Sequence, residues 1–89
     1  MEKNELNKYI EKEFDNIVSD LKDIIAVKSV SVKSNDKKMP FGSECAKVLE
    51  IFLKKAEKSG FKTNNIDNYA GTISFDEKEP ELGILCHID

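Results

Sequence analysis

The first quarter of the chain repeats apolar and polar residues with the period of a helix. Apolar side chains recur at steps of three and four residues, with Lys, Glu, Asp and Asn between them, which predicts one amphipathic helix over residues 3–27. The apolar positions are Leu6, Ile10, Phe14, Ile17, Val18, Leu21, Ile24 and Ile25. A coiled coil is one use of such a stripe. The doubled apolar pairs widen this face, however, so we expect it to pack on a sheet, with Leu21 and Ile25 buried.

A second helix is predicted over residues 43–59, after a serine-containing loop that ends near Pro40. Gly42 or Ser43 is suited to cap its start, and Gly60 supplies the left-handed residue that ends helices. We expect an inner face, with burial at Phe52 and Leu53 in particular, formed by Cys45, Val48, Leu49, Phe52, Leu53 and Ala56.

Three short strands are predicted to follow, at residues 61–66, 69–75 and 82–88. Gly71 interrupts the second strand, where glycine permits a bulge or a close backbone approach. The run 82–86 is apolar at neighbouring positions, so both of its faces need cover, as in a central strand. The predicted fold class is therefore α/β, with two helices packed on a small mixed sheet.

Composition places the chain among globular proteins, because 39% of its 89 residues are hydrophobic and 35% are charged. The net charge is −3, and the 14 basic residues, all lysines, are scattered among 17 acids. Nucleic acid is excluded as a partner, since its recognition needs a clustered basic surface. The sequence shows neither a signal peptide nor an apolar run long enough for a membrane span. We therefore expect a cytoplasmic protein with reduced cysteines.

The last predicted strand ends in the residues best suited to chemistry. His87 is the only histidine, and Asp89 follows two positions later. Alternating strand geometry turns both side chains to one face, where the carboxylate can orient a metal-bound imidazole. A purely structural pair is the alternative that this spacing leaves open. Catalytic zinc takes about three protein ligands, so this chain cannot complete such a site alone.

A cysteine nucleophile at Cys86, with His87 as its base, is the other chemical hypothesis. Neighbouring strand residues face opposite sides, which separates the sulfur from the imidazole. We therefore interpret Cys86, like Cys45 on the second helix, as a packed thiol.

The segment 83–89 resembles the first motif of the metallopeptidase group that contains aminoacylase, carnosinase and succinyl-diaminopimelate desuccinylase. In that group a hydrophobic strand runs into His-x-Asp. The upstream order is similar as well, with residues 21–30 in a long first helix, residues 40–42 opening a second helix, and residues 58–61 closing it. Residues 68–71 are similar to the bacterial dipeptidase V branch, the Xaa-His dipeptidase type.

This resemblance implies that residues 1–89 are the N-terminal portion of a layered α/β zinc-peptidase catalytic domain, without its lid or dimerisation domain. His87 would bind one of two zinc ions, or another divalent metal such as cobalt or manganese. Asp89 would serve catalysis by orienting the His87 ring. The intact enzyme would use a metal-activated water to hydrolyse dipeptides or other short peptides.

The other metal ligands, the general base and the substrate-binding residues would lie beyond residue 89 in that family. The resemblance therefore implies that this chain is inactive alone, with the remainder of its own catalytic domain as its partner. It leaves the oligomeric state open. The alternative is a stand-alone, non-catalytic interaction module of helices and strands, in which His87 and Asp89 form only a structural pair.

Overall fold

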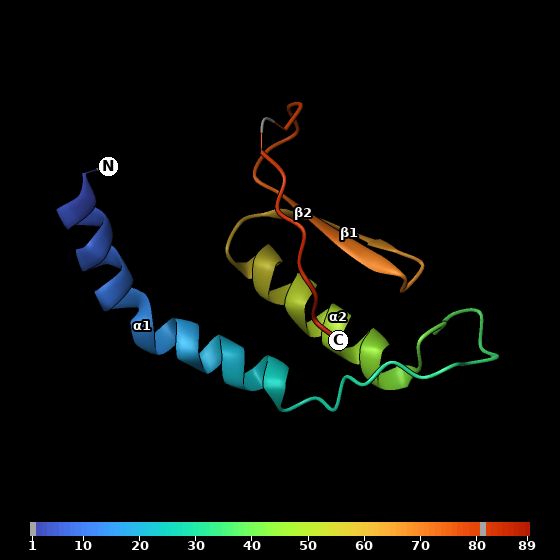
Figure 1. The fold of residues 1–89 in the computed structure, drawn as a ribbon. Helices are drawn as coiled ribbons and strands as arrows, with labels where there is room; N and C mark the ends of the chain where they lie inside the picture. The colour runs from blue at the N-terminus through green and yellow to red at the C-terminus, as the bar shows by residue number, and fades with distance from the viewer. Residues whose placement is uncertain (1, 81) are drawn as a thin grey trace.

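The computed structural model describes residues 2–80 and 82–89. Two helices, α1 (Lys3–Ile25) and α2 (Ser43–Lys58), precede a hairpin of two strands, β1 (Lys62–Ile66) and β2 (Ala70–Ser74) (Figure 1). The predicted α/β class is confirmed, and the predicted ends of all four elements agree to within two residues. The two strands are antiparallel, so the expected mixed sheet is an antiparallel one in the described residues.

The core lies where α2 packs on the hairpin. Its buried side chains are Val48, Leu49 and Leu53 of α2, joined by Val27 just after α1. Phe52 is half-buried. The predicted inner face of α2 is thus confirmed. Its burial stabilises the fold by about 25 cal/mol for each Å² of apolar surface removed from water. Helix α2 contacts both strands, whereas α1 contacts α2.

Glycines set both ends of α2. Gly42 precedes the helix with φ of 98°, and Gly60 follows it with φ of 92°. Beyond the last turn, the Phe61 N–H donates to the Ala56 carbonyl at 3.1 Å and the Gly60 N–H donates to the Glu57 carbonyl at 3.0 Å. These two bonds form a Schellman motif, which confirms the predicted helix end at Gly60.

The hairpin turns through two residues with positive φ, Asp67 at 51° and Asn68 at 61°. Their conformation, together with a 2.8 Å bond from the Tyr69 N–H to the Ile66 carbonyl, matches a type I′ turn, whose twist suits antiparallel strands. The Asn68 side chain also donates to the Lys38 carbonyl at 2.6 Å. This bond ties the loop before α2 to the hairpin.

Gly71 lies at a close approach between β2 and α2. A Cβ atom at this position would lie 2.9 Å from Leu49 Cδ1 and 2.9 Å from Leu53 Cδ2. The close backbone approach predicted from the sequence is therefore confirmed, and glycine is the residue that permits it.

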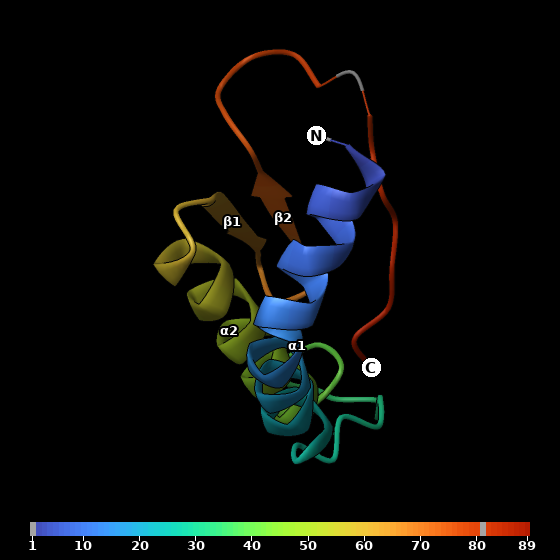
Figure 2. The same ribbon diagram turned by 90° about the vertical axis from the view of Figure 1, so that its left-hand side faces the viewer.

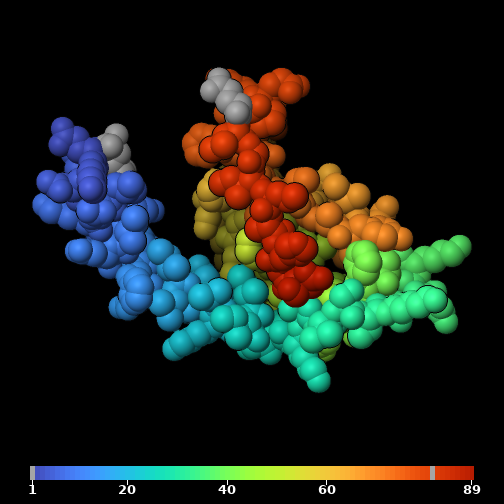
Figure 3. Space-filling model, viewed as in Figure 1, coloured from blue at the N-terminus to red at the C-terminus, as the bar shows by residue number. Residues whose placement is uncertain are grey.

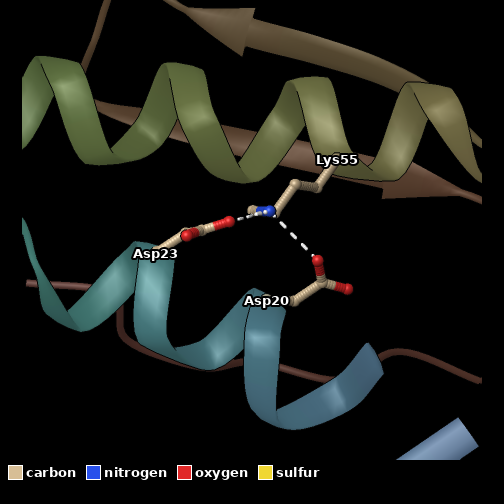
Figure 4. A network of polar contacts seen from close by, with 3 residues as sticks. All are labelled: Asp20, Asp23 and Lys55. Carbon is tan, nitrogen blue, oxygen red and sulfur yellow. Dashed lines mark hydrogen bonds and ion pairs between the residues drawn. The ribbon is translucent and has the colours of Figure 1, made fainter. Parts of the chain in front are cut away.

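Helix α1 departs from the sequence prediction in the face that it buries. Leu21 and Ile25 are 52% and 69% exposed, so their expected burial is wrong. The contact with α2 includes a pair of ion pairs, in which the Lys55 ammonium lies 3.0 Å from an Asp20 oxygen and 2.8 Å from an Asp23 oxygen (Figure 4). Six of the eight apolar side chains of the stripe are open to solvent, and the other two are half-buried. No helix in the described part of the chain is both long and apolar enough to cross a bilayer.

The third predicted strand is also wrong, because residues 82–89 form no strand in the structure. A strand needs a neighbour for its backbone hydrogen bonds, and this segment has none among the described residues. The segment runs apart from α1 in Figure 1 and apart from α2 in Figure 2 over most of its length. Leu82, Ile84 and Leu85 are consequently almost fully exposed, and Cys86 is exposed rather than packed.

Candidate functional site

The two residues singled out from the sequence lie together at the end of the chain. His87 Nδ1 is 3.2 Å from Asp89 Oδ1, as expected for neighbours on one side of an extended segment. The His87 side chain is 91% exposed, and that of Asp89 is 49% exposed. The pair therefore lies on the open surface, where Figure 3 shows the terminal residues on the face turned to the viewer.

This arrangement has a defined chemical use. When Nδ1–H donates to the Asp89 carboxylate, the other ring nitrogen, Nε2, carries the lone pair that binds a metal ion. The imidazole is suited to be one metal ligand, and the carboxylate is suited to orient the ring. No group of three or more His, Cys, Asp or Glu side chains in residues 2–80 and 82–89 is arranged to hold a metal ion. By itself, the pair does not make up a metal site.

The pairing also bears on the cysteine hypothesis. His87 Nδ1 is directed to Asp89, and both cysteines are free, Cys86 exposed and Cys45 half-buried. Burial, reinforced by the nearby charges of Asp89 and Glu44, raises the pKa of the Cys45 thiol. A raised pKa keeps this sulfur protonated and weakly nucleophilic. The expectation of separate, unbridged thiols is confirmed.

A hydrogen bond across 59 positions of sequence anchors the segment that carries the pair. The Ser29 hydroxyl, in the loop after α1, donates to the Ile88 carbonyl at 3.1 Å. The Ser29 carbonyl in turn accepts from the Cys45 thiol at 3.6 Å, in the first turn of α2. Sequence reasoning assigned Ser29 only to a loop. The available signal was its position inside the string at residues 21–30 that resembles the metallopeptidase group.

Hollows on the described surface lie elsewhere. One, of about 490 Å³, lies between α1 and α2 and is lined by Asp23, Ala26, Val27, Ile51 and four lysines of α2. Another, of about 340 Å³, lies beyond the end of β2 and is lined by residues 73–76, 78–80 and 82. Neither includes His87 or Asp89. These two hollows therefore do not shield His87 from water.

Comparison with known proteins gives the geometry a context. No family model matches the chain. Over 77 residues, 84% of this chain, it is 36% identical to proteins named "Putative dipeptidase" from Staphylococcus aureus strains USA300, NCTC 8325 and COL. The chain shares partial homology with these dipeptidases. It spans only 16% of their length, so the similarity relates this chain to one part of such proteins.

Proposed function

We propose that this chain is the N-terminal part of a metal-dependent dipeptidase, in which His87 binds a zinc ion and Asp89 orients the imidazole. The observation that carries the proposal is the 3.2 Å contact between His87 Nδ1 and Asp89 Oδ1. It occurs directly after an apolar run, in a chain with partial homology to dipeptidases. Cytoplasmic location and a short peptide substrate are part of the same proposal.

The roles of the two side chains follow from their chemistry. A bound zinc ion supplies a water of lowered pKa and polarises a carbonyl oxygen. Asp89 accepts a hydrogen bond from Nδ1–H, which fixes the tautomer of His87, limits rotation of the ring and makes Nε2 a stronger donor to the metal. His87 contributes one ligand, and the remaining ligands, a second zinc ion and the general base belong to other parts of the proposed enzyme. Cobalt or manganese are candidate replacements for zinc.

The exposed apolar segments support this proposal. Leu82, Ile84 and Leu85 form a run that is suited to a central strand, yet residues 2–80 and 82–89 provide it with neither a neighbouring strand nor cover. Six of the eight apolar side chains in the α1 stripe from Leu6 to Ile25 are also exposed. Contiguous apolar surface of this kind marks an interaction site. We propose that the remainder of the catalytic domain covers both surfaces and converts residues 82–88 into a paired strand.

The exposed stripe also favours a second candidate, a stand-alone module that binds another protein through α1. The coding sequence after Asp89 separates the two functions. A continuation with further acidic and histidine motifs, whose purified product hydrolyses dipeptides in a metal-dependent way, supports the dipeptidase. A stop codon directly after Asp89, or a full-length product that hydrolyses no dipeptide with any of the three metals, contradicts it and leaves the interaction module.

A further inference from the structure

The strongest unassigned feature is the polar connection between the loop after α1 and the segment that carries His87. Ser29 is half-buried, and three of its backbone and side-chain atoms have partners. Its N–H donates to the Val27 carbonyl at 2.9 Å, its carbonyl accepts from Cys45, and its hydroxyl donates to Ile88. Val27 is buried in the core, so the Ser29 backbone is fixed against the folded part of the chain.

The hydrogen bond from the Ser29 hydroxyl is made to the peptide group that directly precedes Asp89. The Ile88 carbonyl belongs to the planar peptide group between Ile88 and Asp89, so holding its oxygen restrains the orientation of that group. The orientation of this peptide group restrains the direction in which the Asp89 side chain leaves the backbone. The group lies one residue after His87, whose ring meets the Asp89 carboxylate at 3.2 Å.

We infer that Ser29 is a positioning residue for the metal motif, which holds the Ile88 peptide so that the Asp89 carboxylate faces the His87 ring. This inference rests on the proposed function. A metal ligand works when its direction is held to within about 10–20°, and an exposed segment without regular secondary structure does not supply that order by itself. The Ser29 hydroxyl supplies it by holding the segment that carries His87, while the Ser29 backbone is bonded to Val27 in the core and to Cys45 on α2.

Three possible roles of Ser29 predict different effects of replacing its side chain. A residue that only fills space in the loop tolerates alanine, since the hydroxyl would contribute nothing. If Ser29 only stabilised the fold, its replacement would lower the free energy of unfolding and leave the metal affinity unchanged. A positioning residue changes metal affinity and the ligand field while the fold persists, and threonine, which keeps a hydroxyl donor on the same atom, preserves the function.

The test uses the product of the complete reading frame that contains these residues, with Ser29→Ala, Ser29→Thr and a matched control, Ser31→Ala, on an exposed serine of the same loop. The probe is Co²⁺ alone, titrated into metal-free protein and followed by its ligand-field absorption. Removing an outer support of a metal ligand lowers affinity by about 10- to 100-fold. Because Ser29 acts through a backbone group, we expect a loss of about 10-fold for Ser29→Ala, the low end of that range, with an altered Co²⁺ spectrum.

Ser29→Thr and Ser31→Ala are expected to keep the affinity and spectrum of the original protein, and urea unfolding checks that all variants fold. If the original protein binds Co²⁺ and Ser29→Ala binds it equally well with an unchanged spectrum, the positioning role is overturned while the proposed function stands. If Ser29→Thr loses as much affinity as Ser29→Ala, the hydroxyl is not the responsible group and the inference is again overturned. A full-length product that binds no Co²⁺ refutes the proposed function, and the role of Ser29 with it.

Discussion

Replacing Gly71 by alanine tests the packing of β2 on α2. The added Cβ would begin 2.9 Å from one methyl carbon of Leu49 and 2.9 Å from one of Leu53. Carbon atoms in contact lie about 3.5–4.0 Å apart, so each methyl group would have to retreat from 2.9 Å by roughly 0.6–1.1 Å. Both leucines are buried and have little free space to occupy.

Overpacking of this kind costs about 1–3 kcal/mol. Part of the cost is offset, because φ of Gly71 lies outside the left-handed region and alanine there reduces the entropy of the unfolded chain, a gain of about 0.4–1 kcal/mol. We therefore expect Gly71→Ala to lower the free energy of unfolding by about 1–2 kcal/mol.

The assay is urea unfolding of the 89-residue chain, followed by circular dichroism at the helix band. With a denaturant slope of about 1 kcal/mol per M, the midpoint should fall by about 1–2 M. Gly83→Ala is the matched control, because nothing lies within 4 Å of its added Cβ and its backbone is not left-handed. Its unfolding free energy should stay within about 0.5 kcal/mol of the original. Equal midpoints for the two variants would refute the close packing of β2 on α2.

Three further predictions concern charge, thiols and the carboxylate. Ion pairs with Asp23 and Asp20 raise the pKa of Lys55, so its link to α1 is present below the ordinary lysine pKa and is lost as pH rises through the raised value. Lys55→Met should likewise speed amide exchange in the second half of α1, and 1 M salt should mimic it. Iodoacetamide should alkylate exposed Cys86 before Cys45, as mass spectrometry would show, and the reverse order would contradict the structure. In the full-length product, Asp89→Ala should keep the fold and lower metal affinity or activity by about 10- to 100-fold.

Local signals account for what the sequence predicted well. Helical periodicity, the glycine at position 60 and the hairpin between two β-prone runs act over a few residues, so the bounds of α1, α2, β1 and β2 were predicted closely. The side chain spacing of His87 and Asp89 is equally local, and the structure brings the two side chains together. Their role in metal binding stays a prediction.

Features that depend on distant partners were not predictable in the same way. An apolar run at residues 82–88 becomes a strand only beside another strand, and the described residues offer none. Burial of Leu21 and Ile25 requires a surface opposite their face of α1. The polar side of the helix instead forms ion pairs with Lys55 of α2. The bond from Ser29 to Ile88 joins residues 59 positions apart, and no periodicity indicates such a pairing.

The metal content of the full-length product and of its His87→Ala variant tests the central claim most directly. Each protein would be purified without added chelator, its metal counted per chain by elemental analysis, and its fold compared by circular dichroism. The account predicts zinc in the original protein and a marked loss of it in a variant that is otherwise folded, because one ligand of the site has been removed. The same zinc content in both proteins would show that His87 is not a metal ligand and would contradict the account.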